Sequence, residues 1–367
     1  MKTYIFGARA TAVGLYKALS VLEPEKKVDA FLVSERNGNP EEIWGCPVML
    51  MDEAVSTLKE EEKKDTVVYV AVPELIHDKV QILLNEKGFS NLQMLDSRKE
   101  AYMMEQFYEK VGLFSSVHSL PIEEIGNVLN LPKLTVYAAA FYKDKALNCQ
   151  PIFPEYVRKL YVGCDKARKL GIDISGKADF YDDMGENISV KNPIYCEMTA
   201  HYWIWKNRMD TNDEYVGVCH YRRMLDISDA DLRRMKEHDV DVVLPFPMFH
   251  FPDAGIHHTW YLSDKDWNTM RQVLKELYPE YEVKYEEVFG QPYFYNYNMM
   301  IAKKEVFADY CAWVYPILER IEKISNMNHI DREDRYMGYI CENLMTLYFG
   351  YHKDDLKIYH TGRLLFT

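Results

Sequence analysis

The chain has 367 residues, of which 48% are hydrophobic and 28% charged, and its formal net charge is −13. This length exceeds one ordinary hydrophobic core and predicts two domains. The acidic balance argues against a nucleic-acid-binding protein, although a small anion could be gripped locally. The seven cysteines show neither a disulfide framework nor paired zinc motifs, which favours the cytoplasm. Since no run approaches the roughly 18 apolar residues of a membrane span, we expect at most peripheral contact with the inner membrane face.

Residues 1–115 alternate short apolar runs with helical patterns, which predicts a Rossmann-like domain built on a parallel sheet. An irregular stretch at 116–132 is interpreted as a linker to a second domain. The expected strands are Thr3–Phe6, Val28–Val33, Thr66–Val72 and Leu92–Leu95, and the expected helices are Thr11–Leu22, Glu74–Lys87 and Arg98–Val111.

The turn from Gly7 to Gly14 follows a strand and opens a helix, which is where a phosphate-binding loop belongs. Its glycine spacing departs from GxGxxG, since Ala8, Arg9 and Ala10 occupy the region where the second glycine is needed. Glu35 lies where a ribose-binding acid is expected. Two interpretations stay open, a nucleotide site or a Rossmann-like domain without a cofactor.

Residues 133–367 again alternate strands and helices, so a second α/β domain is predicted there. The expected strands are Leu134–Ala140, Tyr215–Cys219, Val240–Leu244, Asn298–Ala302 and Leu356–Tyr359, and the expected helices are Pro193–Lys206, Asp229–Glu237, Asp264–Leu277, Lys304–Ile324 and Arg335–Phe349.

A polar helix start leads into the aromatic segment of this second domain. Asn192 before Pro193 predicts a cap that satisfies free backbone N–H groups. Glu197, His201 and Trp205 then recur every four residues and are expected to share one helix face. They could hold a sugar or ribose, or they could form a packed, hydrogen-bonded core.

The apolar strand that follows ends in His220, Tyr221, Arg222 and Arg223. Alternation along the strand predicts that His220 and Arg222 share one side, with the other two residues opposite. Ligands bind at the carboxyl edge of open α/β sheets, and guanidinium groups pair with phosphate oxygens. We therefore expect the arginines to grip a phosphate group, with a structural ion pair as the alternative for one of them.

The strings GENIS, KNPIYCEMTAHYWIWKN and GVCHYRR, with YNMM at 297–300 and RYMGYICENL at 335–344, resemble domain-of-unknown-function family 4422. That family is associated with capsular and exopolysaccharide synthesis and GT-A-type glycosyltransferases. The resemblance implies a glycosyltransferase (a hexosyltransferase) with a GT-A-like α/β domain. It also implies a nucleotide-sugar donor, specifically a UDP-sugar with UDP-galactofuranose as one option, and a glycan or lipid-linked glycan acceptor.

The resemblance and the motifs together assign candidate roles. The catalytic base is expected at Asp334 or Glu342, because inversion requires a carboxylate to accept the acceptor proton. The donor-binding residues are expected to be Asn187, Asn192, Glu197, His220, Arg222, Arg223 and His360, and the acceptor-binding residues His201, Trp205, Tyr297 and Asn298.

No residue is assigned to a metal. The chain carries His-x-Arg where many GT-A enzymes carry Asp-x-Asp, so arginine is expected to replace metal charge, with Mg or Mn left open as a cofactor. His250, His257 and His258 fit no metal spacing and are assigned to a substrate loop or to solvent.

Two other functions are weighed against sugar transfer. One is an NAD(P)- or nucleotide-sugar-binding oxidoreductase centred on the Gly7 loop, and the other is a non-catalytic assembly protein. Homo-oligomerisation is left open.

Overall fold

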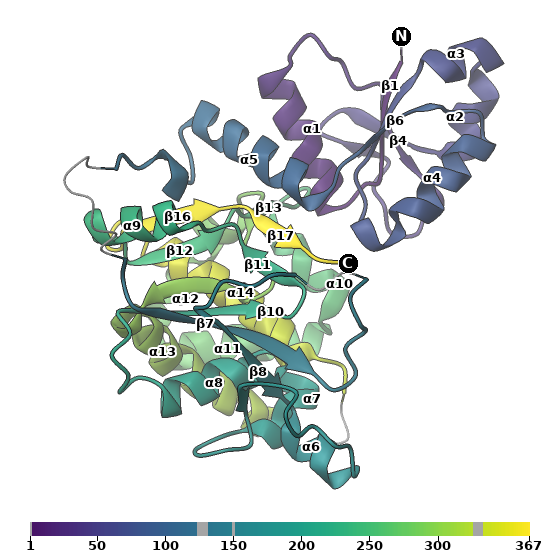
Figure 1. Cartoon of the computed structure of the whole chain (residues 1–367). Coiled ribbons are helices and arrows are strands. Elements are labelled where there is room, and N and C mark those ends of the chain that lie inside the picture. The colour runs from purple at the N-terminus through teal and green to yellow at the C-terminus, as the bar shows by residue number, and fades with distance from the viewer. Residues whose placement is uncertain (1, 123–130, 149–150, 326–332) are drawn as a thin grey trace.

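The computed structural model describes residues 2–122, 131–148, 151–325 and 333–367. A six-stranded sheet near the amino end and a larger, nine-stranded sheet carry most of this part of the chain (Figure 1). Neighbouring strands are parallel through most of the first sheet and through half of the larger one, and helices alternate with the strands, which confirms the predicted α/β class. Within the described residues, no helix is both long and apolar enough to span a membrane.

The first sheet has the strand order β3-β4-β2-β1-β5-β6. Helix α1 packs on one face, and α2 and α4 pack on the other, so both faces of the sheet are buried. The strands and helices predicted for this part of the chain are present. The segment between β2 and β5 also forms two strands, β3 and β4, and two helices, α2 and α3, that the sequence did not predict. The elements are β1 (Thr3–Phe6), α1 (Ala10–Leu22), β2 (Ala30–Val33), β3 (Glu42–Ile43), β4 (Cys46–Leu50), α2 (Met51–Thr57), α3 (Glu60–Asp65), β5 (Val67–Val70), α4 (His77–Glu86) and β6 (Asn91–Met94).

Helix α5 (Ser97–Val111) lies between the two sheets. Asp96 caps it by accepting from the Lys99 N–H at 2.8 Å, and Gly112 ends it in the left-handed region at φ 70°. The helix packs against α1 and against the last strand of the chain. Its Tyr108 hydroxyl donates to the Pro247 carbonyl at 2.8 Å, so α5 joins the amino-terminal sheet to the larger one.

The larger sheet runs β16-β12-β15-β10-β7-β8-β9, with β11 and β17 attached at the end of β10. Strands β7, β8, β9 and β10 are parallel, so their carboxyl ends lie on one edge. The strands are β7 (Leu134–Phe141), β8 (Val157–Val162), β9 (Phe180–Tyr181), β10 (Tyr215–His220), β11 (Arg223–Leu225), β12 (Val242–Pro245), β15 (Met300–Lys303), β16 (Ile358–Thr361) and β17 (Arg363–Leu365); β13 (Met248–Phe249) and β14 (Tyr293–Phe294) form a separate pair.

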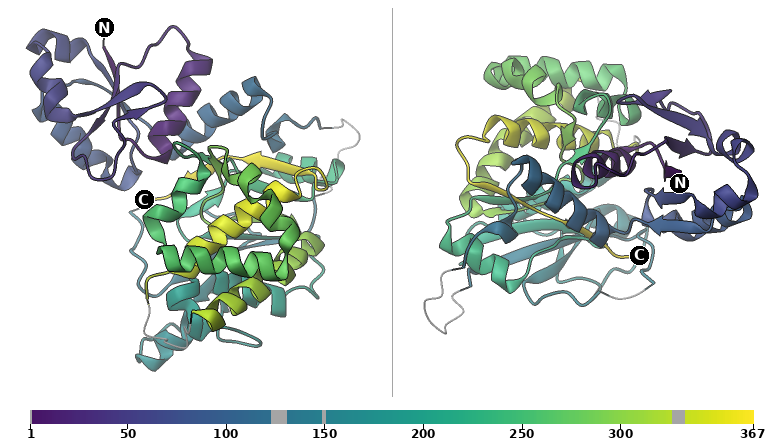
Figure 2. Two further views of the ribbon diagram at one scale, coloured as in Figure 1. Left: turned by 180° about the vertical axis from the view of Figure 1, so that it is seen from behind. Right: turned by 90° about the horizontal axis from the view of Figure 1, so that it is seen from above.

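Helices cover the larger sheet unequally, as the view from behind shows (Figure 2). One face packs against six helices around a large aromatic core, and the other face packs against α9. The helices are α6 (Cys164–Lys169), α7 (Asn192–Tyr195), α8 (Met198–Asn207), α9 (Asp229–Glu237), α10 (His258–Tyr261), α11 (Asp264–Leu277), α12 (Pro279–Phe289), α13 (Lys304–Ile324) and α14 (Tyr336–Tyr351).

The predicted continuous helix Pro193–Lys206 is wrong. The chain forms α7, breaks at Cys196 with φ 52°, and resumes as α8. The predicted strand start at Asn298 is also wrong, because Tyr297 and Asn298 take φ values of 75° and 48° and the strand begins two residues later.

Candidate functional site

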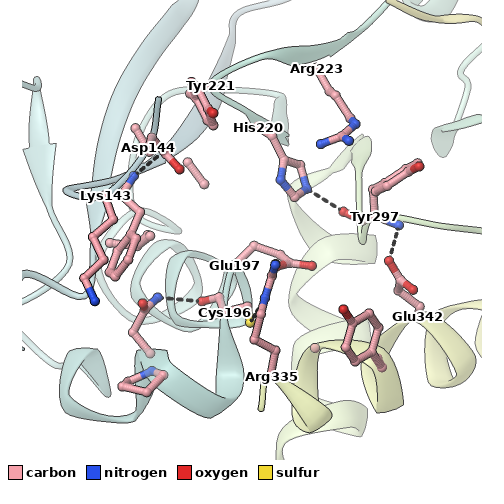
Figure 3. A pocket seen from close by; sticks show the side chains of 18 of the residues that line it. Lys143, Asp144, Cys196, Glu197, His220, Tyr221, Arg223, Tyr297, Arg335 and Glu342 are labelled. Atoms are coloured by element: carbon pink, nitrogen blue, oxygen red, sulfur yellow. Dashed lines mark hydrogen bonds between the residues drawn. The ribbon is translucent and has the colours of Figure 1, made fainter. Parts of the chain in front are cut away.

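A cavity of about 540 Å³ opens at the carboxyl edge of β7, β8 and β10 (Figure 3). Its walls also come from the α7–α8 junction, from α10, from the turn before β15 and from the start of α14. The charged and histidine side chains that line it are Lys143, Asp144, Lys166, Glu197, His220, Arg222, Arg223, His257, Glu333, Arg335 and Glu342. This position agrees with the rule that ligands bind beyond the carboxyl ends of strands in open α/β sheets.

Strand β10 delivers the basic cluster through a tight turn. The strand is buried, and a Cβ at Gly217 would lie 2.9 Å from side-chain atoms of Val136 and Ile301, so the neighbouring strands pack closely there. The chain turns after His220 and returns as β11, with His220 paired to Arg223. Because the strand ends at the turn, the predicted alternation fails, and all four residues of the His-Tyr-Arg-Arg cluster line the cavity.

The two arginines differ in their surroundings. The Arg223 guanidinium lies 4.4 Å from the ring centre of Tyr297, and burial lowers its pKa. The Arg222 Nε is buried and has no hydrogen-bond partner among the described residues. A buried N–H donor without a partner is costly unless a ligand pairs with it, so the Nε of the half-buried Arg222 is suited to bind an anion.

The break between α7 and α8 places Glu197 at the cavity wall. Asn192 lines the cavity but does not cap a helix start: its Nδ2 donates to the Cys196 carbonyl at 2.9 Å, at the end of α7. Arg335 donates from Nε to the Cys196 sulfur at 3.2 Å. Cys196, whose backbone has a positive φ, thus bonds Asn192 through its carbonyl and Arg335 through its sulfur.

The predicted face of Glu197, His201 and Trp205 is divided. Only the first of the three lines the cavity. His201 is buried behind it, where its Nε2 bonds the Asn298 carbonyl at 2.9 Å and burial lowers its pKa to about 4. Trp205 stacks on Tyr315 at 5.6 Å in the helical core. The sugar-contact role assigned to His201 and Trp205 therefore has no support from their placement.

Asn298 acts on the cavity through Glu197. Its side chain is buried, and Nδ2 donates to Glu197 Oε1 at 2.8 Å and to the Gly338 carbonyl at 3.2 Å. Since Asn298 itself does not line the cavity, it orients the carboxylate instead of binding a sugar directly.

Tyr297 connects three cavity residues through three different groups (Figure 3). Its backbone N–H donates to Glu342 Oε1 at 2.7 Å, and its carbonyl accepts from His220 Nε2 at 2.8 Å. Its ring lies beneath Arg223. The left-handed backbone of Tyr297, which sequence could not reveal, is what turns these groups toward the cavity.

Of the two candidate bases, Glu342 lies in the cavity and Asp334 does not. Burial raises the pKa of the Glu342 carboxyl to about 8, and the nearby charge of Glu197 contributes in the same direction. Asp334 is exposed, whereas its neighbour Glu333 lines the cavity and pairs with Lys166. Asp331 and Arg332, which belong to the same acidic segment, lie outside the described residues.

Two further residues predicted to bind the donor lie elsewhere. Asn187 lies in a loop, where its Oδ1 accepts from the Ser189 N–H at 3.2 Å. His360 is buried among aromatic rings, and its Nε2 bonds the Tyr295 hydroxyl at 2.7 Å. Neither lines the cavity.

Several cavity residues were not predicted as part of the site. Arg335 and Tyr339 have a weak signal in the sequence, since both lie in the RYMGY segment, but Lys166 and Tyr261 have none. The solvent role considered for the loop histidines is wrong for His250 and His257, which are 2% and 1% exposed.

The arrangement of acidic and histidine groups over the described ranges can be compared with that of a divalent metal site. Across residues 2–122, 131–148, 151–325 and 333–367, no three His, Cys, Asp or Glu side chains converge as a metal site. The strand end that carries Asp-x-Asp in metal-binding GT-A domains carries His220 and Arg222 here. His220 and Arg222 both line the cavity at this strand end.

Comparisons with known proteins agree with this fold. A solved structure of the WbbM bifunctional glycosyltransferase in its apo form is similar, with a TM-score of 0.52 and 25% sequence identity over 64% of this chain and 45% of that chain. The chain thus spans less than half of that protein, and it is similar in fold to a glycosyltransferase. No curated protein matches the chain. A family model described as a domain of unknown function, DUF4422, matches residues 148–353, more than half of the chain, and the protein therefore belongs to the DUF4422 family.

Proposed function

We propose that this protein is a glycosyltransferase that moves a sugar from a nucleotide-sugar donor to a glycan acceptor. The observation that carries the proposal is one cavity that holds both a basic cluster and a buried carboxylate with a raised pKa. A basic cluster suits a diphosphate, and a carboxylate of raised pKa suits the removal of a proton from a hydroxyl. The fold shared with a glycosyltransferase supports the same reading.

The donor side of the cavity is proposed to lie at the ends of β7 and β10. Lys143, Arg222 and Arg223 line the cavity beyond these strand ends, and Arg222 has a free buried donor for a phosphate oxygen. Guanidinium groups bind phosphate oxygens in a bidentate fashion and neutralise the charge that develops as the diphosphate departs. We propose that the arginines supply the positive charge that a divalent ion supplies in other enzymes.

The acceptor side is proposed to lie around Glu342. Tyr261 and Tyr339 line the cavity there, with ring centres 4.5 Å apart and an interplanar angle of 15°. Tyr261 is 47% exposed, so this pair offers an aromatic surface on which a sugar ring can rest. A saccharide on that surface would present a hydroxyl to Glu342, which lies one turn beyond Tyr339 on α14.

The reaction is proposed to invert the anomeric carbon. The acceptor oxygen bonds to that carbon, its proton passes to Glu342, and the bond to the diphosphate breaks with its electron pair leaving on phosphate. The donor is proposed to be a UDP-sugar, with UDP-galactofuranose the first to test, and the product a capsular or exopolysaccharide precursor at the cytoplasmic side of the membrane. The family resemblance, and not the cavity, motivates these details.

Ligand binding by calorimetry tests the proposal with UDP, a panel of UDP-sugars and NAD(P). We expect UDP-sugars to bind and Arg222→Ala to weaken them by at least about tenfold, because loss of a charge-assisted contact costs roughly 1.5–3 kcal/mol. Arg320→Ala is the matched control, since Arg320 pairs with Glu276 outside the cavity. NAD(P) binding without UDP-sugar binding would refute the proposal and favour an oxidoreductase.

Transfer assays with and without EDTA test the role of arginine. Transfer is expected to persist in EDTA, because the cavity supplies cationic side chains in place of a metal site. Complete loss of transfer in EDTA, with recovery on adding Mg or Mn, would contradict the proposed arginine role while leaving the glycosyltransferase assignment intact.

A further inference from the structure

His257 is a buried histidine next to Glu342 to which neither the fold nor the proposed reaction assigns a role. It is 1% exposed, and its Nε2 lies 3.4 Å from Glu342 Oε2. Its ring stacks on Phe294, with centres 4.0 Å apart and an angle of 24° between the planes. Packing therefore fixes the direction in which the imidazole faces the carboxylate.

The surroundings of the ring decide which nitrogen carries the proton. Burial lowers the pKa of His257 to about 3, so the imidazole is neutral and has one N–H. Its Nδ1 is buried without a partner among the described residues, whereas Nε2 lies 3.4 Å from Glu342 Oε2 and 3.5 Å from the side-chain amide of Asn296. Because Asn296 Oδ1 is buried without a partner among the described residues, we assign the amide with its oxygen toward Nε2, so that both neighbours of Nε2 are acceptors. A buried N–H without an acceptor is costly, so the proton belongs on Nε2.

The two oxygens of Glu342 then face two N–H donors on different parts of the chain. Oε1 accepts from the Tyr297 backbone, and Oε2 faces His257. Hydrogen bonds to a carboxylate favour its charged form, which opposes the effect of burial. Among the described residues, the other titratable or charged groups that interact with Glu342 are Glu197, His220, Arg335, Tyr261, Tyr339 and the thiols of Cys196 and Cys341. Those that face His257 are His250, His258 and Tyr261.

We propose that His257 is a positioning residue for Glu342, holding Oε2 through an Nε2–H donor so that the ionised carboxylate faces the acceptor hydroxyl. The inference rests on the proposed glycosyl transfer. The distance of 3.4 Å is long for a hydrogen bond, and such contacts often tighten when substrate closes the site. During transfer the proton of the acceptor hydroxyl moves to Glu342. His257 keeps its own proton, and only its hydrogen bond to Glu342 changes in strength.

Nuclear magnetic resonance of the full chain labelled with [15N]histidine tests the geometry without any transfer assay. His257→Gln identifies the His257 signals among the eleven histidines. We expect a neutral Nε2–H tautomer whose 15N shifts change as Glu342 ionises near pH 8, and no such change in Glu342→Gln. A dominant Nδ1–H tautomer, or the same pH response in Glu342→Gln, would overturn the proposal.

The pH profile of kcat/KM gives the functional test. His257→Leu removes the hydrogen-bond donor, so the pKa of Glu342 should rise. The acidic limb of the kcat/KM profile should then shift to higher pH by roughly one unit, the equivalent of about 1.4 kcal/mol. His257→Gln retains an amide N–H at a similar distance from the backbone, so its acidic limb should stay at the pH of the original protein. The KM for the sugar donor should be unchanged in both variants. His238→Gln serves as the matched control, because His238 is half-buried at the end of α9, bonds the Pro121 carbonyl at 2.8 Å and does not line the cavity.

The two proposals fail in different ways. If the unaltered protein transfers no sugar from any UDP-sugar, the proposed function fails, and the tautomer measurement still decides the His257–Glu342 contact. If the protein transfers sugar and His257→Leu keeps the original pH profile, the positioning role of His257 is wrong while glycosyl transfer stands.

Discussion

At the scale of single residues, Glu342 makes folding depend on pH. Its pKa is about 8 in the folded chain, mainly because the carboxyl is buried, against roughly 4.3 in an unfolded chain. The folded state therefore binds this proton more tightly. The stability that follows is fully present below about pH 4 and is lost as the pH rises through about 8.

Replacement of this carboxyl by an amide should remove that dependence. The free energy of unfolding of Glu342→Gln, taken relative to that of the original protein, is expected to be higher at pH 9 than at pH 5. The increase should be on the order of a few kcal/mol. Urea denaturation at the two pH values measures the difference. Asp334→Asn is the control, because Asp334 is exposed and should show little change. An equal effect of Glu342→Gln at both pH values would mean that Glu342 ionises normally.

The same pair of variants assigns the base. Glu342→Gln should lower kcat by roughly 10²–10⁴-fold and leave donor affinity nearly unchanged, because a general base acts mainly in the transition state. Asp334→Asn should retain kcat within a few-fold, since its side chain does not line the cavity. A large loss of kcat in Asp334→Asn alone would transfer the role to Asp334.

At the scale of elements, the junction of β8 and α6 supports the cavity wall. Gly163 joins them at φ 67°, and a Cβ there would lie 2.7 Å from Asn192 Oδ1 and 2.9 Å from Phe141 Cε2. Both of these neighbours line the cavity. The absence of a side chain at this position lets α7 and the end of β7 approach the turn.

Gly163→Ala should therefore destabilise the fold through both backbone strain and a clash. Gly171→Ala, at φ 68° with nothing within 4 Å of its Cβ, measures the strain alone. We expect Gly163→Ala to cost roughly 1–3 kcal/mol more than Gly171→Ala in denaturant unfolding, a cost typical of overpacking. Equal costs would show that Asn192 and Phe141 move aside freely.

At the scale of the whole molecule, the loop after β1 contacts helix α10, which lines the cavity through Tyr261. Arg9, in the loop after β1, lies over the ring of Trp260 at 4.5 Å, and Trp260 belongs to α10 beside His257 and Tyr261. The small second cavity, about 30 Å³, contacts Ala10 but not Gly7 or Glu35. Gly7 lines neither this cavity nor the one of about 540 Å³.

Hydrogen exchange can measure the support that this contact gives to α10. Arg9→Ala should increase amide exchange across residues 254–262 by a few-fold, since a cation–π contact at an exposed site is worth about 0.5–1 kcal/mol. Exchange in α13 should stay the same. Arg36→Ala is the matched control in the same sheet, because Arg36 bonds Val48 and Glu53. Unchanged exchange at α10 would show that the amino-terminal sheet does not stabilise it.

Sequence patterns predicted the elements with strong periodicity and missed features set by single backbone angles or distant contacts. The bounds of α13 match the prediction, because its apolar residues repeat at helical spacing over 21 residues. The break at Cys196 has no glycine or proline to announce it. The pairing of Glu342 with His257 joins segments far apart in the chain, so no local pattern carries it.

The joint role of Tyr297 bears on how this site can change during evolution or redesign. One residue with a left-handed backbone serves the candidate base through its N–H, a histidine through its carbonyl and an arginine through its ring. A substitution that shifts this backbone would disturb all three at once, so specificity cannot be tuned there in small steps. Tyr261, exposed at the cavity mouth, can be varied without that penalty, and new acceptor preferences are expected to arise there first.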